Sequence, residues 1–194
     1  MPQLSPPILA KATHNFSTED LLGTVGFGRV YKGSFKDDPP TIVAVKSICT
    51  IERLRHKNIV LLLGWCHEDE HLLLVYEYMP NGSLDRYIGK CHLDWETRFK
   101  ILTGLASALL YLHEDSGNPV VHRYIKPNNV MLDEEFNAHL SNVGLARLLQ
   151  NDAAVTTMLA GTPGYLAPEV GFIGKSTPES DVYSFGMVAI KGYH

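Results

Sequence analysis

Residues 122–129 read His-Arg-Tyr-Ile-Lys-Pro-Asn-Asn, a polar stretch between two short apolar runs at residues 120–121 and 130–132. We expect both runs to be short strands and the stretch between them to be a loop that presents polar side chains. Tyr124 carries a phenol, which is bulky and neutral near pH 7 because its pKa is about 10. Whatever chemistry this loop supports, it has no carboxylate to act as a base.

The residues before position 80 read as an antiparallel sheet that follows a Pro-rich leader with a short helix near residues 7–14. Alternating or β-branched apolar runs predict strands. These runs cover a strand–loop–strand at residues 21–32, a strand at 41–46, and a hairpin of residues 60–66 and 71–76.

The pattern after residue 80 is helical. Asp94 is a good N-cap, and apolar residues follow it at steps of three and four, which predicts an amphipathic helix ending near Gly117. Residues 180–190 predict a last helix that is apolar on most sides and therefore buried. A sheet followed by helices, with Pro80-Asn81-Gly82 at the join, predicts an α+β fold of two lobes. The expected parts are a leader at residues 1–20, a first lobe at 21–79 and a second lobe at 80–194.

Composition narrows the class of protein. With 45% hydrophobic and 20% charged residues in a chain of 194, we expect a buried core rather than disorder. The net charge of −4 offers no basic surface for nucleic acid. The chain shows no signal peptide, and its longest helical apolar stretch is well short of the roughly 20 residues of a membrane span. Three cysteines without metal-like spacing predict reduced thiols in a cytoplasmic setting.

Several motifs follow one another in a fixed order. Gly23-Thr-Val-Gly-Phe-Gly28 alone could be an ordinary glycine-rich hairpin turn, but Lys46 stands eighteen residues after it, in Val-Ala-Val-Lys. Residues 122–129 come next, then Ser-Asn-Val-Gly at residues 141–144, and then Gly-Thr-Pro-Gly-Tyr-Leu-Ala-Pro-Glu at residues 161–169.

Together these motifs resemble the protein kinase family, whose catalytic loop reads H-R-D-x-x-x-x-N. The residues of these motifs are most similar to those of plant receptor-like serine/threonine kinases. Two segments, Leu63-Gly-Trp-Cys66 and Val130-Met-Leu-Asp133, are most like the lectin-domain receptor kinases. The resemblance covers about residues 8–190. It implies a two-lobed kinase fold and ATP-dependent phosphoryl transfer to protein hydroxyls.

The resemblance also implies a nucleotide site. Its glycines would let backbone amides approach the ATP phosphates, and a lysine on a strand would contact the same phosphates. The backbone of the hinge would bind adenine, with Tyr76 at the gatekeeper position. The implied nucleotide contacts are Leu22, Gly23, Val25, Gly28, Val30, Ala44, Lys46, Glu77, Met79 and Met131. Taken singly, Met131 reads as an ordinary core residue.

The implied catalytic positions are Tyr124, where kinases place the aspartate base, together with Lys126 and Asn129. The implied Mg²⁺ ligands are Asn129 and Asn142. These two neutral amides would hold Mg²⁺ poorly, because Mg²⁺ is normally bound through carboxylates. His122, Arg123 and Asp181 have structural roles by resemblance, with Asp181 tying the last helix to the catalytic loop.

An activation segment is implied between residues 144 and 169. Its residues of interest are Thr156, Thr157, Thr162 and Glu169. Thr156 and Thr157 stand where an activating phosphate would sit, although a solvated loop is the simpler interpretation of both. Thr162 and Lys126 are typical of serine/threonine kinases.

The departures from the kinase pattern affect positions with implied functional roles. Besides Tyr124 and Asn142, they include Val25 at the middle glycine and Val143 at the phenylalanine of D-F-G. Only nine residues, 47–55, separate Lys46 from His56, where kinases place a whole helix whose Glu pairs with the lysine. A three-turn helix needs about 11 residues, so we expect it to be absent. Glu52 is the only acid in this interval and could pair with Lys46, but a solvated loop residue is the simpler interpretation.

The resemblance also implies further helices beyond His194, so we expect Val182, Phe185, Met187, Val188 and Ile190 to be partly exposed. Three hypotheses remain open. The chain is an active serine/threonine kinase, a pseudokinase binding module that holds ATP or docks on an intact receptor-like kinase or another protein, or a decayed copy without a selected function. This chain is expected in the cytoplasm, and full-length relatives at the plasma membrane with a cytoplasmic kinase domain.

Overall fold

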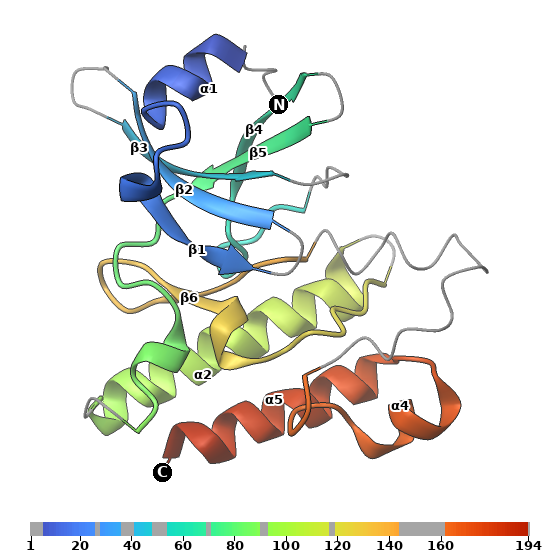
Figure 1. Cartoon of the computed structure of the whole chain (residues 1–194). Helices are drawn as coiled ribbons and strands as arrows, with labels where there is room; N and C mark the ends of the chain where they lie inside the picture. Colours follow the sequence, from blue (N-terminus) through green and yellow to red (C-terminus); the bar gives the residue numbers. More distant parts are fainter. Residues whose placement is uncertain are drawn as a thin grey trace. The chain divides into compact units, whose positions relative to one another are not determined.

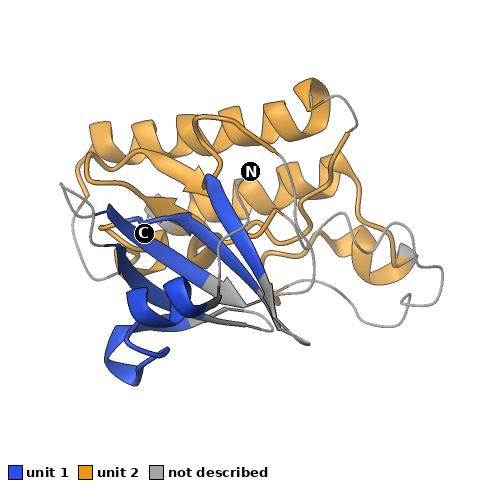
Figure 2. Cartoon of the chain, turned by 90° about the horizontal axis from the view of Figure 1, so that it is seen from above, with its two compact units in different colours: residues 1–53, 61–79 blue, residues 54–60, 80–194 orange. Residues whose placement is uncertain are grey.

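The computed structural model describes residues 6–25, 28–35, 41–47, 54–68, 71–89, 93–116, 119–143 and 162–193. The chain divides into two compact units, Met1–Arg53 with Leu61–Met79, and Leu54–Val60 with Pro80–His194. Figure 2 shows unit 1 in blue and unit 2 in orange. The lobe boundaries expected at residues 20 and 79 stay predictions.

Unit 1 is an antiparallel sheet of five strands with a short helix packed on it (Figure 1). The strand order is β1-β2-β3-β5-β4, where consecutive strands in this order are hydrogen-bonded neighbours. The elements are α1 (Pro6–Ala12), η1 (Thr18–Asp20), β1 (Leu21–Val25), β2 (Gly28–Phe35), β3 (Thr41–Ser47), β4 (Leu62–Glu68) and β5 (His71–Glu77).

The core of unit 1 follows from strand alternation. Val43 and Val45 on β3 are buried together with Leu9 of α1, Cys66 and Val75. Position 44 lies between them and therefore belongs to the opposite face of the sheet. The expected helix near residues 7–14, the strand pair after residue 21 and the hairpin around residue 70 are confirmed within a few residues.

Unit 2 is mainly helical (Figure 1). Its elements are η2 (Leu84–Arg86), α2 (Trp95–Leu110), the π-helical turn η3 (Tyr111–Asp115), η4 (Pro127–Asn129), β6 (Val130–Leu132), β7 (Ala138–Leu140), α4 (Pro168–Ile173) and α5 (Pro178–Tyr193). The side chain of Asp94 caps α2 by accepting a hydrogen bond from Thr97 N, as its position predicts. The buried side of α2 includes Ile101 and Leu105, which belong to the same core as Leu132 and Leu140.

Residues 54–60 belong to unit 2 because their backbone pairs with β7. Val60 N donates to Leu140 O at 3.1 Å, and Leu140 N donates to Asn58 O at 2.8 Å. The Asn58 side chain adds a bond from Nδ2 to Ala138 O at 2.8 Å. These contacts join positions some 80 residues apart, and the strand pattern around residue 60 did not indicate them.

The strand expected at residues 120–121 is wrong. Val120 and Val121 are buried, but Val120 N donates to Leu112 O and the backbone from residue 119 to 125 is irregular. The next amides, of His122 and Arg123, donate to a carboxylate instead of to a neighbouring strand. Burial of apolar residues therefore occurs here without a strand, because side-chain acceptors replace the strand partner.

The last helix, α5, is only partly buried. Val188 is fully buried, Phe185 and Met187 are half-buried, and Val182 and Ile190 are exposed by 56% and 57%. The expectation of a fully buried helix is therefore wrong, and the expectation of partial exposure is confirmed for all of these residues except Val188.

Candidate functional site

The loop at residues 120–125 is hydrogen-bonded to one buried carboxylate on α5, that of Asp181. Asp181 Oδ2 accepts from His122 N at 2.7 Å and from His113 Nε2 at 3.0 Å, and Asp181 Oδ1 accepts from Arg123 N at 2.8 Å. The Asp181 residue is 1% exposed. Hydrogen bonds from backbone amides to a buried carboxylate are strong, so this side chain can hold the loop against α5 in the manner that the resemblance implies.

The His122 ring fixes the turn of the loop from inside. Nε2 lies 2.9 Å from Ser141 O, which can only accept, so Nε2 carries the proton. Nδ1 then accepts from Tyr124 N at 3.2 Å. Burial lowers the pKa of His122, against the opposing effect of nearby Asp181. The ring is therefore neutral and structural, and unsuited to replace the missing base.

Tyr124 stands at the position that the kinase resemblance assigns to the catalytic base. Its side chain is half-buried, and burial raises the pKa of its phenol, with Arg123 acting in the opposite direction. The hydroxyl therefore stays protonated at neutral pH and cannot take a proton from a substrate hydroxyl. Neighbouring Arg123 adopts a positive φ of 71°, and half-buried Lys126 precedes η4.

Asn129 ends η4 and is almost fully buried, with 3% of its surface exposed. Its Nδ2 donates to Tyr124 O at 2.7 Å, and its Oδ1 accepts from Asn142 Nδ2 at 2.9 Å. Asn142 has a φ of 65°, a left-handed conformation that asparagine tolerates better than most residues. The structure therefore brings Tyr124, Asn129 and Asn142 together, as the motif order implies.

These residues do not fit a magnesium ion. Mg²⁺ takes oxygen ligands and usually at least one carboxylate, whereas Asn142 presents an N–H group toward Asn129. Within the described part of the chain, no group of three or more His, Cys, Asp or Glu side chains could hold a metal ion.

The positions assigned to the nucleotide on β1, β2 and β3 lie on neighbouring strands of unit 1. Register pairs Gly23 with Val30, and Val30 with Lys46. Ala44 pairs with Lys32 on β2 and with Tyr76 on β5. Leu22 on β1 is 38% exposed. Val25 pairs with Gly28 where β1 meets β2.

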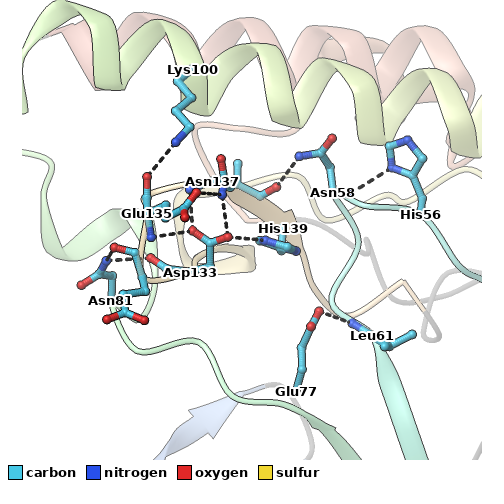
Figure 3. Close-up of polar contacts among 12 residues, drawn as sticks. His56, Asn58, Leu61, Glu77, Asn81, Lys100, Asp133, Glu135, Asn137 and His139 are labelled. Carbon is cyan, nitrogen blue, oxygen red and sulfur yellow. Dashed lines mark hydrogen bonds and ion pairs between the residues drawn. The ribbon is translucent and has the colours of Figure 1, made fainter.

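Of the two residues that the resemblance assigns to the hinge, Glu77 is the last residue of β5 and Met79 lies two positions beyond it. The Glu77 carboxylate accepts from Leu61 N at 2.6 Å (Figure 3). In addition, Glu77 N donates to Leu61 O at 3.0 Å. Met79 is buried. Met131, the expected floor of the adenine pocket, is half-buried on β6 of unit 2 and makes an isolated bridge with Ser83.

The end of the activation segment is partly described. Thr162 is half-buried, and Glu169 is exposed in the first turn of α4. Ser184 Oγ on α5 donates to Tyr165 O at 2.7 Å, and Lys191 Nζ lies 4.1 Å from the centre of the Tyr165 ring. Thr156, Thr157 and Glu52 lie outside the described residues, as do Cys49 and Cys91.

Sequence reasoning missed two features near this loop. One is His113, the third donor to Asp181, for which the spacing carried no signal. The other is the turn between β6 and β7, where Asp133 accepts bonds from Asn137 and His139 (Figure 3). An aspartate followed by a polar run is a recognisable turn signal.

Comparison with known proteins identifies the family. The model of the protein kinase domain matches residues 16–193. The chain belongs to the protein kinase domain family, and it is of the plant receptor kinase type. Unit 1 with its antiparallel sheet is the N-lobe and helical unit 2 the C-lobe of a kinase-like fold.

The curated relatives are receptor kinases of plants. L-type lectin-domain containing receptor kinase IX.1 of Arabidopsis thaliana is 48% identical over 201 residues, which cover 94% of this chain and 31% of that protein. L-type lectin-domain containing receptor kinase SIT2 of Oryza sativa subsp. japonica is 47% identical over 201 residues, 94% of this chain and 30% of that protein. The chain thus spans about a third of the length of these relatives.

Among solved structures, the pseudokinase domain of BIR2, an immune regulator of the RLK/Pelle family, matches with a TM-score of 0.79 and 33% identity. The match covers 94% of this chain and 60% of that chain. No helix in the described part of the present chain is long and apolar enough to cross a bilayer.

The alignment lengths agree with a missing internal segment. The 94% of this chain that aligns with the receptor kinase IX.1 is about 182 of 194 residues, about 19 fewer than the 201 aligned. A deletion between Lys46 and His56, as predicted from the spacing, would account for a difference of this size.

Proposed function

We propose that this chain is a non-catalytic protein kinase domain of the serine/threonine class, a pseudokinase that works by binding another protein. The observation that carries this proposal is the half-buried phenol of Tyr124 at the position of the catalytic base. A positioned base contributes roughly 10²- to 10⁴-fold in rate. A phenol whose pKa is raised above its ordinary value cannot replace it at neutral pH.

The metal side of the site supports the same conclusion. Kinases stabilise the transferred phosphoryl group chiefly by electrostatics, with Mg²⁺ held by an aspartate and an asparagine. Here Asn142 takes the place of that aspartate, and its amide is directed at Asn129. The loss of base and of metal carboxylate affects one catalytic unit, so the two losses need not be additive. We expect phosphoryl transfer to be negligible.

We further propose a receptor-like kinase as the partner, at the cytoplasmic side of the plasma membrane. The curated relatives are receptor kinases, and the solved neighbour is a pseudokinase described as an immune regulator of the RLK/Pelle family. ATP is a proposed ligand of unit 1, at the sheet positions around Lys46 and at Glu77 and Met79.

A transfer assay tests the catalytic part of the proposal. The chain, its Lys46→Ala variant and an active lectin-domain receptor kinase domain are incubated with labelled ATP, Mg²⁺ and a general protein substrate. We expect the wild-type chain and Lys46→Ala to incorporate equally little label. Incorporation that depends on Lys46 would show an active kinase and refute the proposal.

A thermal melt with and without ATP tests whether the chain is a folded binding module. A cooperative transition is expected, and a ligand at 100 times its Kd would stabilise the fold by about 2.7 kcal/mol. A chain without any cooperative transition would be the decayed copy. Binding of the folded chain to an immobilised receptor kinase domain, with heat-unfolded chain as the control, then tests the partner.

A further inference from the structure

Asn129 and Asn142 are at the two positions that the kinase resemblance assigns to metal ligands, and an Asp and an Asn would hold Mg²⁺ there in a kinase. Asn129 lies in η4, at the end of the catalytic loop, and Asn142 lies just after β7. One hydrogen bond of 2.9 Å, from Asn142 Nδ2 to Asn129 Oδ1, joins the two segments directly. Both residues belong to unit 2.

The chemistry of the neighbours determines the orientation of both amides. Tyr124 O is a carbonyl and can only accept, so the nitrogen of Asn129 must face it, at 2.7 Å. The oxygen of Asn129 then faces Asn142, which must present its own nitrogen. The same nitrogen lies 3.4 Å from Ser141 Oγ, whose proton is used in a bond to Asn129 O at 3.1 Å. Every donor in this chain of bonds meets an acceptor.

An aspartate at position 142 could not make this contact. Its carboxylate oxygen would lie about 2.9 Å from Asn129 Oδ1, two acceptors with no proton between them. Such a pair is unfavourable unless a cation lies between the oxygens. The amide of Asn142 can therefore contact Asn129 without a metal ion. A carboxylate at position 142 could do so only with a cation between the two oxygens.

We propose that the Asn142 amide replaces the divalent cation as the link between the catalytic loop and the segment after β7, so that the stability of this domain does not depend on divalent cations. The proposal predicts that Asn142→Asp alone creates a cation site with Asn129 Oδ1. The left-handed φ of residue 142 is compatible with aspartate. The inference concerns the metal and holds whether or not the chain binds a partner protein, so the two proposals can fail separately.

The test compares thermal melts of the whole chain in EDTA and in MnCl₂, together with Mn²⁺ binding followed by the loss of the electron paramagnetic resonance signal of free Mn²⁺. Asn128→Asp is the matched control, because residue 128 is exposed next to Asn129 in η4 and the change adds the same charge. We expect the melts of the wild-type chain and Asn128→Asp to be equal in both solutions.

Asn142→Asp is expected to melt lower than wild type in EDTA and to recover in MnCl₂. It should bind one Mn²⁺ at least about tenfold more tightly than wild type, because a carboxylate is added to the site. A wild-type chain that is destabilised by EDTA would overturn the proposal. So would an Asn142→Asp variant that is as stable as wild type in EDTA, or one that fails to fold even with Mn²⁺, because the cation should restore the link.

Discussion

Two glycines in helix interiors should respond in opposite ways to the same substitution, alanine. Gly104 lies in α2 and Gly186 in α5. A Cβ atom added to Gly104 would lie 2.9 Å from Asn58 Nδ2 and 3.3 Å from the Cβ of Ala138. A Cβ atom added to Gly186 would meet no heavy atom within 4 Å in the described part of the chain. The first position is crowded and the second is open.

The crowded position controls a buried hydrogen bond. Asn58 Nδ2 donates to Ala138 O at 2.8 Å, and Asn58 is 8% exposed. A methyl group on residue 104 would push the amide away and leave a buried donor and a buried acceptor without each other. A buried polar group left unsatisfied costs about 1–3 kcal/mol.

The magnitudes follow from this difference. Alanine is favoured over glycine in a helix by about 1 kcal/mol. For Gly186→Ala this gain stands alone, so we expect the free energy of unfolding to rise by about 0.5–1 kcal/mol. For Gly104→Ala the lost bond and the crowding outweigh the gain, and we expect a net loss of about 1–3 kcal/mol.

Urea unfolding followed by circular dichroism at the helix band would measure both variants against wild type at neutral pH. The midpoints should move in opposite directions with an unchanged dependence on urea. If Gly104→Ala were as stabilising as Gly186→Ala, the contact between Asn58 and Ala138 would not be the constraint on α2 that the distances imply.

Further predictions concern the loop and the core of unit 2. Asp181→Ala should cost about 3–5 kcal/mol, because it leaves the buried amide of His122 and the partly buried amide of Arg123 without an acceptor. Asp181→Asn, which keeps one oxygen, should cost less, and equal urea midpoints for the two variants would contradict this. Leu105→Ala should cost about 2–5 kcal/mol and Phe99→Ala, on the exposed side of the same helix, about 0.5 kcal/mol or less, as measured by the same unfolding curves. Burial lowers the pKa of His122, so the folded chain resists protonation where the unfolded imidazole, with a pKa of about 6.5, takes up a proton. Stability should therefore fall from pH 7 to pH 5.5, by at most about 1.4 kcal/mol per pH unit from this group, and a flat profile over that range would refute the assignment.

The strands and the long helix could be predicted from the sequence because local pattern decides them. Asp94 caps α2 and the apolar spacing defines its buried side. The helix nevertheless ends at Leu110 and continues as a π-helical turn to Asp115, a detail that spacing does not encode. Burial at residues 120–121 suggested a strand, yet the amides that follow donate to Asp181.

The candidate site was predictable to the extent that it depends on residue identity. A tyrosine for the base and an asparagine for the metal carboxylate are visible in the chain itself, since charge and acidity are properties of the side chain. The amide orientation at Asn129 was not, because it depends on a carbonyl at Tyr124 and a hydroxyl at Ser141, which only the folded backbone brings within hydrogen-bonding distance.

The sequence by itself determined which chemical groups this protein has at each kinase position, and so the family to which it belongs and the two groups that it lacks. Only the tertiary structure decided which partner each polar group takes. Asn58 reaches Ala138, and Asn142 reaches Asn129. The reason is physical: a buried donor must find an acceptor, and the nearest one is chosen by packing between segments far apart in the chain.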